Sequence, residues 1–234
     1  MKLNFRKGMY DGIPIMLGYL SVSFGFGILA VNCGLSVFAA GMVSLTNITS
    51  AGQAAGVEII AAAGSVIEMI LVQITINMRY SLMALSLSQK CDESFTPIHR
   101  LIASYGITDE IFALCAAQEQ KLRPSYMYGM ISVAALGWTS GTVLGAAAGE
   151  LLPSSVSSAM GIMLYGMFIA IIIPPARKNI SVLVTVIIAA LISILFKYLL
   201  TAVSGGFAVM ISAIIAAAAA AVLFPVKDEE GEQT

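Results

Sequence analysis

The chain has 234 residues, of which 59% are hydrophobic and 11% are charged, and its mean hydropathy is +0.92. A soluble domain carries roughly 25% charged residues, so this chain has more apolar surface than a core of its size can bury, and the surplus must face lipid. This composition excludes a soluble enzyme, and a net charge of −1 provides no basic field for nucleic acid. Three scattered cysteines predict neither a disulfide framework nor a zinc site.

The first apolar stretch, residues 13–31, is expected to stay in the protein as a membrane span. Basic residues precede it, but it is longer than the apolar region of a signal peptide and no A-x-A cleavage site follows it. Cys33 stands in a lipoprotein-like context, yet Asn32 occupies the place where such a site needs a small residue. We therefore expect neither kind of cleavage.

A bilayer core of about 30 Å requires about 20 apolar residues per helix, and charged or turn-rich interruptions divide the chain accordingly. The eight segments are 13–31, 35–56, 57–85, 101–119, 126–152, 155–173, 180–201 and 206–224. The sequence thus predicts an all-α, polytopic membrane bundle of about seven or eight spans, at least one of them broken or re-entrant. An N-terminal segment (1–12), a transporter domain (13–224) and a polar tail (225–234) complete the expected organisation.

Lysine and arginine in the short loops indicate the orientation. Basic clusters lie at residues 2–7, 121–123 and 177–178, whereas the turns at 32–34, 153–154 and 204–205 carry no basic residue. By the positive-inside rule we expect both termini to lie in the cytoplasm. The protein itself is expected in the cell membrane. An odd number of crossings, one or three, must then separate Asn32 from Lys121.

Residues 44–56 read SLTNITSAGQAAG, a polar and small-residue stretch inside an apolar segment. Irregular backbone at membrane depth is tolerated where protein buries it or where it lines a watery cavity, and broken helices build the substrate sites of transporters. We expect a break here, with Gln53 lining the transport path. A helix contact rich in hydroxyls and glycines is the alternative.

Glycines recur every four residues at 137, 141, 145 and 149. In lipid, such a ridge lets two helix backbones approach closely and so replaces the hydrophobic effect as a source of association. The ridge predicts packing against another helix or a partner subunit, and it indicates no chemistry.

Ionisable groups near the bilayer centre are costly, so each needs a partner, a cavity or a route to the interface. Glu68 and Arg79 are eleven residues apart, about three helical turns, and lie on one stripe. Gln73 and Asn77 form an amide pair on a neighbouring strip. We expect this polar side to serve substrate binding or coupling, with a snorkelling arginine at the membrane boundary as the alternative for Arg79.

Thr108, Asp109 and Glu110 follow one another inside an apolar frame. A carboxylate in this position could receive a substrate ammonium or carry a proton, and burial and any nearby Arg79 would set its pKa. The same three residues also make a good helix N-cap, with acids at the positive end of the helix dipole. Both roles are compatible.

The sequence predicts no enzyme, no catalytic residues, no metal site and no cofactor. His99 is the one histidine, and the metalloprotease, nucleophile-elbow and Walker motifs are absent. Energy for transport would then come from ion or substrate gradients.

In this order, several short motifs resemble the AzlC-like (azaleucine-resistance) branched-chain amino acid permease family. They are Gly12-Ile-Pro14 with Gly18-Tyr19, Met42-Val-Ser44-Leu45 leading to Ala51-Gly52-Gln53, Asn77-Met-Arg79-Tyr80, Thr108-Asp109-Glu110-x-Phe112-Ala113-Leu114, and Gly137-Trp138-x-x-Gly141-Thr142. Two departures fall at the suspected cavity: Tyr80 stands where the family favours His, and residues 47–50 replace a more apolar run.

The resemblance implies the large subunit of an exporter of branched-chain amino acids, working with a small hydrophobic AzlD-like subunit. In the mechanism that we expect, Arg79 or backbone N–H groups at the 44–56 break bind the substrate carboxylate, and Asp109 or Glu110 takes the ammonium or couples a proton. Alternatives are a non-transporting membrane scaffold, a passive channel, or a carrier for another small amino acid.

Overall fold

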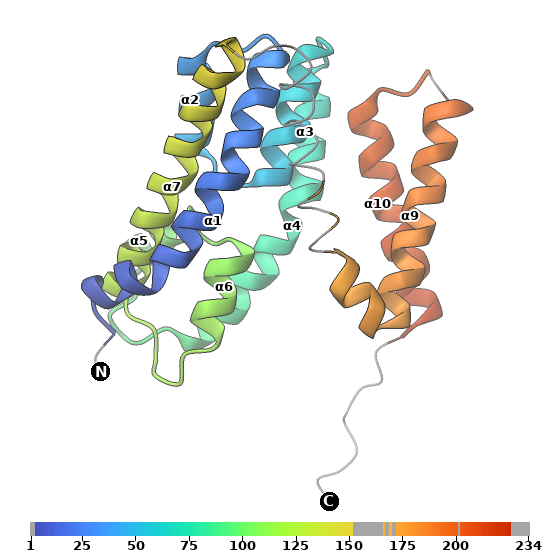
Figure 1. The fold of residues 1–234 in the computed structure, drawn as a ribbon. Helices are drawn as coiled ribbons and strands as arrows, with labels where there is room; N and C mark the ends of the chain where they lie inside the picture. The colour runs from blue at the N-terminus through green and yellow to red at the C-terminus, as the bar shows by residue number, and fades with distance from the viewer. Residues whose placement is uncertain (1–2, 152–165, 167–168, 170–171, 201, 226–234) are drawn as a thin grey trace, which may run out of the picture.

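The computed structural model describes residues 3–151, 166, 169, 172–200 and 202–225. This part of the chain is helical between its turns (Figure 1). Five of its helices are long and apolar enough to cross a bilayer. They are α1 (Phe5–Asn32), α4 (Val66–Lys90), α7 (Pro124–Leu151), α9 (Ile180–Tyr198) and α10 (Gly205–Leu223). The predicted all-α membrane bundle is confirmed.

Helices α1 and α7, of 28 residues each, lie side by side and run in the same direction (Figure 1). The glycine ridge of α7 faces α1: a Cβ atom at Gly137 would lie 2.5 Å from the Met16 carbonyl oxygen, and one at Gly145 would collide with the backbone of Phe24. The two backbones therefore touch, which no larger residue would permit. The predicted role of the ridge in packing is confirmed.

Helices α2 (Val37–Thr46) and α3 (Ser50–Ala61) form a re-entrant hairpin. The hairpin enters from the end of the molecule where α1 terminates, turns at about half its depth and returns to the same end (Figure 1). The hydroxyl of Thr46 donates to the carbonyls of Met42 and Val43, and such side-chain bonds compete with the helical ladder. The predicted break within residues 44–56 is confirmed, at residues 47–49.

Helices α5 (Pro97–Ser104) and α6 (Asp109–Ala116) form a second hairpin, which enters from the opposite end. The tips of the two hairpins meet where the Tyr105 hydroxyl donates to the Leu45 carbonyl. The expectation that residues 101–119 form one span is wrong. The chain breaks at 105–108, where Gly106 packs against Ile131 with no room for a Cβ and Thr108 adopts the extended conformation of an N-cap, from which α6 begins.

Helix α4 is the one crossing between the Asn32 turn and the basic residues around position 121, in agreement with an odd count. Segments 35–56 and 57–85 therefore become the first hairpin followed by α4. The segment predicted at 155–173 lies mostly outside the described residues, as does nearly all of the predicted tail.

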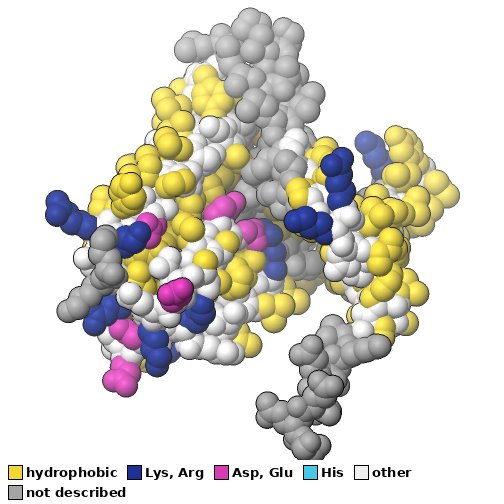
Figure 2. Space-filling model, turned by 60° about the horizontal axis from the view of Figure 1, so that its bottom comes forward, with side chains coloured by type: hydrophobic (Ala, Val, Ile, Leu, Met, Phe, Trp, Pro, Cys, Tyr) yellow, Lys and Arg dark blue, Asp and Glu magenta, His cyan; other side chains and the backbone are white. Residues whose placement is uncertain are grey.

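Charged side chains gather at one end of the molecule. Helix α1 begins and α10 ends there, and Figure 2 shows lysine, arginine, aspartate and glutamate spread over this face. At this end, Lys90 donates to the carbonyls of Ala116 and Gln118, and these hydrogen bonds join the end of α4 to the end of α6. This grouping agrees with the loop charges from which the orientation was predicted.

Candidate functional site

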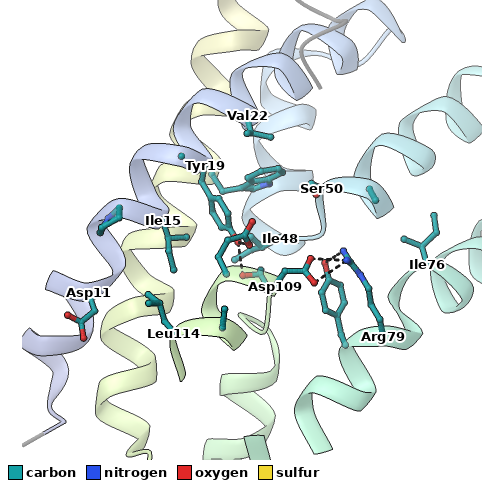
Figure 3. Close-up of a pocket in the computed structure, with 18 of the residues that line it drawn as sticks. Asp11, Ile15, Tyr19, Val22, Ile48, Ser50, Ile76, Arg79, Asp109 and Leu114 are labelled. Atoms are coloured by element: carbon teal, nitrogen blue, oxygen red, sulfur yellow. Dashed lines mark hydrogen bonds and ion pairs between the residues drawn. The ribbon is translucent and has the colours of Figure 1, made fainter. Parts of the chain in front are cut away.

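A cavity of about 740 Å³ lies between the two hairpins and the α1–α7 pair (Figure 3). Tyr19 and Trp138, at the middle of α1 and α7, both line it, so the cavity sits at the centre of the two longest helices. Its volume falls within the range of about 300–1,000 Å³ that is usual for small-molecule sites. Much of its wall is apolar, contributed by Ile15, Val22, Ile48, Ile76, Ala113 and Leu114.

An ion pair between α4 and α6 forms the polar side of the cavity. Arg79 Nη1 lies 2.8 Å from Asp109 Oδ2 and 3.1 Å from Oδ1, and both side chains are about 40% exposed. The guanidinium also donates to the Tyr80 hydroxyl at 3.2 Å and lies over its ring. Arg79 therefore points toward Asp109 (Figure 3), and both residues line the cavity.

A second polar group joins α1 to the start of α6. Hydrogen bonds connect the Tyr19 hydroxyl to Thr108 Oγ1 and to Glu110 Oε2, each at 2.6 Å. The Thr108 hydroxyl also accepts from the Ile111 N–H and so caps α6. Thr108 thus has both roles that its position suggested: it caps the helix and it lines the cavity.

The starts of α3 and α6 both open into the cavity, but only one of them is capped. Ser50 and Ala51, the first two residues of α3, line it, and the preceding Thr49 makes no side-chain capping bond. The first N–H groups of a helix have no partner within the helix and carry its positive dipole end. At α6, by contrast, Asp109 and Glu110 place negative charge beside that end.

Gln53 lies behind the cavity wall rather than in it. Its side chain is 2% exposed, accepts from the Trp138 indole N–H at 2.7 Å and donates to Ser44 Oγ at 2.9 Å. Ser44 in turn lies 2.7 Å from Thr142 Oγ1. This chain of hydrogen bonds ties both helices of the first hairpin to α7, so Gln53 holds the site together.

Asn77 and Glu68, which the sequence also predicted as site residues, do not line the cavity either. Asn77 donates to Gln73 on its own helix, at 3.0 Å. Glu68 is 4% exposed and accepts from the Ser204 hydroxyl and, at 3.0 Å, from the Gly206 N–H. Glu68 therefore caps α10 and joins it to α4, three turns away from Arg79.

Several cavity residues were not singled out from the sequence as site residues. Tyr19 and Trp138 pack edge to face with their ring centroids 5.3 Å apart, and Asp11 lines the cavity near the charged end. A signal was available for the two aromatics, because a tyrosine hydroxyl or an indole N–H in the middle of an apolar span requires a polar partner.

Two hairpins that meet at mid-depth beside a cavity define a multi-pass membrane protein of the discontinuous-helix kind, an architecture found in transporters. The chain belongs to the AzlC family, whose model ("AzlC protein") matches residues 14–152. An uncharacterized membrane protein of Archaeoglobus fulgidus is 30% identical over 73% of this chain and 75% of its own length. The inner membrane protein YgaZ of Escherichia coli K12 is 26% identical over 78% of this chain and 77% of its own length.

A membrane protein of Helicobacter pylori is 27% identical over 63% of this chain and 67% of its own length. No solved structure matches the chain. Membership of the AzlC family therefore places this chain among membrane proteins.

Proposed function

We propose that the chain is the large subunit of a secondary transporter that exports branched-chain amino acids. The observation that carries the proposal is the cavity, which combines an apolar wall with the uncapped start of α3 and two carboxylates at the start of α6. A free amino acid needs these three features, since it carries a carboxylate, an ammonium and a side chain.

The substrate carboxylate would bind the N–H groups at the start of α3. Arg79 is the alternative partner, but its charge is already matched by Asp109 at 2.8 Å, whereas the N–H groups of Ser50 and Ala51 have no side-chain cap. Helix N-termini bind carboxylates readily because they offer both hydrogen-bond donors and a positive dipole end. Asp109 and Glu110 would attract the ammonium from the other side.

The branched side chain would lie against the apolar wall formed by Ile15, Val22 and Leu114. The cavity could then open in turn to each side if one hairpin moves against the other at the tips, where Tyr105 donates to the Leu45 carbonyl. Proton or ion coupling and a small AzlD-like membrane subunit complete the proposal, with both termini in the cytoplasm.

The test is export of preloaded, labelled leucine from cells that express this chain with and without a small AzlD-like subunit. We expect label to leave only when both are present, and to saturate with internal leucine as a carrier requires. Retained leucine at normal expression, followed by a negative screen of other amino acids, would favour a membrane scaffold instead. Flux that fails to saturate would indicate a channel.

Arg79→Gln and Asp109→Asn should each abolish export while the protein remains folded in the membrane. The matched control is Arg123→Gln, because Arg123 makes a similar ion pair, with Asp92 at 3.2 Å, at the charged end outside the cavity. Full export by both cavity variants would refute the assignment of the site.

A further inference from the structure

One glycine in the interior of α1 has open space where a side chain would stand. A Cβ atom at Gly18 would have no described atom within 4 Å. The glycines of the α1–α7 contact differ: a Cβ atom at Gly12 would lie 2.5 Å from the Val133 side chain, and one at Gly27 would collide with the Thr142 carbonyl. Contact with α7 therefore does not explain why position 18 is a glycine.

A glycine in the middle of a helix needs a reason, because after proline it is the residue least favourable there. In membrane spans the usual reason is the close approach of another helix. Gly34 and Gly205 also have open space beside them, but Gly34 lies in a turn with a φ of +89°, and Gly205 is the first residue of α10. Neither reason applies to Gly18.

Gly18 belongs to the stripe of α1 that faces the cavity. The residues of α1 that line the cavity follow one another at helical spacing: Asp11, Pro14, Ile15, Gly18, Tyr19 and Val22. Ile15 stands three residues before Gly18 and Val22 four residues after it, so both are its neighbours on this face. Figure 3 shows Ile15, Tyr19 and Val22 along this side of the helix. The absent side chain thus leaves a recess in the cavity wall between two apolar residues.

The recess lies beside the group that would hold the substrate ammonium. Tyr19 follows Gly18 in the chain, and its hydroxyl is hydrogen-bonded to Glu110 at 2.6 Å. The tyrosine side chain separates this carboxylate from the backbone of α1, so the recess and the carboxylate are about one side chain apart. The side chain of an amino acid whose ammonium lies at Glu110 can span that separation.

We propose that the recess at Gly18 is the subsite for the substrate side chain, and that Gly18 sets the size of side chain that the site accepts. Its flanking residues are apolar, so it favours an aliphatic side chain and offers a polar one no partner. The whole cavity, at about 740 Å³, is large enough for drug-sized ligands and cannot by itself distinguish leucine from alanine. This inference rests on the proposed function, because it requires an amino acid in the cavity.

The experiment is equilibrium binding of labelled glycine, alanine, valine and leucine to the purified full-length protein. These ligands share one ammonium and one carboxylate and differ only in the side chain. Each methylene buried in the recess should tighten binding by about four-fold, so affinity should rise from alanine to leucine. In Gly18→Ala the ratio of leucine affinity to alanine affinity should fall by about four-fold, and in Gly18→Leu by about ten-fold or more. The affinity for glycine should stay within about two-fold of that of the parent protein.

Ser21→Leu is the matched control. Ser21 is an exposed residue of the same helix that does not line the cavity, and its hydroxyl bonds to the Leu17 carbonyl one turn away. Added bulk at this position should leave the affinity ratios unchanged. Gly18→Ala should also unfold at a higher SDS fraction than the parent, since alanine favours the helix and meets no described atom here. That measurement shows that the variant is folded.

Parental affinity ratios in both Gly18 variants would overturn the inference and leave the transporter in place. An equal loss of affinity for all four amino acids would also overturn it, because that result indicates a hinge in α1, four residues after Pro14, rather than a subsite. A parent protein that binds none of the four and exports no leucine would refute the proposed function itself.

Discussion

Replacing Gln53 by leucine separates a structural role from a role in substrate binding. The substitution keeps the approximate volume of the side chain but removes the acceptor for the Trp138 indole and the donor to Ser44. The indole N–H loses its partner in a site where Gln53 itself is 2% exposed. Ser44 keeps its bond to Thr142 and is left satisfied.

The expected cost follows from these two bonds. An orphaned buried donor costs about 1–3 kcal/mol, and loss of the bond to Ser44 costs about 0.5–1.5 kcal/mol. The free energies measured for interhelical hydrogen bonds in membrane proteins lie toward the lower part of these ranges. We therefore expect Gln53→Leu to lower the free energy of unfolding by about 2 kcal/mol.

The assay is unfolding of the purified protein by increasing mole fraction of SDS, followed by Trp138 fluorescence, alongside leucine binding below the transition. We expect a clear loss of stability with leucine affinity unchanged within about two-fold, since Gln53 does not line the cavity. Gln118→Leu is the control, because Gln118 follows the C-cap of α6 directly and its side chain donates to the carbonyl of Leu114 in that helix, outside the cavity. A stable Gln53→Leu protein that binds leucine poorly would refute this reasoning and restore Gln53 to the transport path.

Three further predictions follow from single contacts. Gly145→Ala should lower stability by about 1–3 kcal/mol, because its Cβ would meet the Phe24 backbone, whereas Gly149→Ala on the same ridge has its nearest neighbour at 3.4 Å and should be close to neutral in SDS unfolding. Tyr19→Phe should cost about 1.5–3 kcal/mol in the same assay and reduce leucine export, since it leaves a carboxylate at the start of α6 without its donor. A hydrogen bond from the Ser94 hydroxyl, together with Arg123, lowers the pKa of Asp92 below its ordinary 3.8. The ionised carboxylate therefore stabilises the folded protein above pH 3.8, and this contribution is lost as the pH falls through the lowered pKa. Asp92→Asn should accordingly be less stable than the parent protein at neutral pH and equally stable in acid.

Composition and residue spacing were sufficient to predict the features that a lipid environment requires of any membrane-spanning chain. The long spans, the glycine ridge of α7 and the break near Ser50 each follow from a local property: apolar length, small residues at helical spacing, or polar residues at membrane depth. The contact between Arg79 and Asp109 could also be suspected, because two opposite charges in apolar segments need partners.

Hydropathy could not reveal the second hairpin. It reports how apolar a segment is and not how far the segment penetrates, so a pair of short helices that turns back reads like one span. The turn at Gly106 packs against the side chain of Ile131 in α7, a contact between segments that the local sequence does not show.

The same limit applies to individual polar residues. Gln53 and Glu68 were expected in the transport path because buried polar groups need a reason to be there. Their reasons are Trp138 in one case and the start of α10 in the other, both distant in sequence. A sequence shows that a partner is required, and the fold decides which partner is provided.

The helix starts in the two hairpins differ in the charge that they present to the cavity. Each hairpin brings a helix start, with its positive dipole end, to the central cavity from opposite ends of the molecule. At α6 Thr108 caps the helix start, and Glu110 adds a negative charge beyond that of Asp109, which Arg79 matches; that side of the cavity is therefore attractive to a cation such as an ammonium. At α3 the positive end has no side-chain cap, which makes the facing side attractive to an anion such as a carboxylate. Because Asp109 already neutralises Arg79, a zwitterion with its ammonium and its carboxylate bonded to one carbon matches this arrangement better than a purely cationic or anionic substrate would.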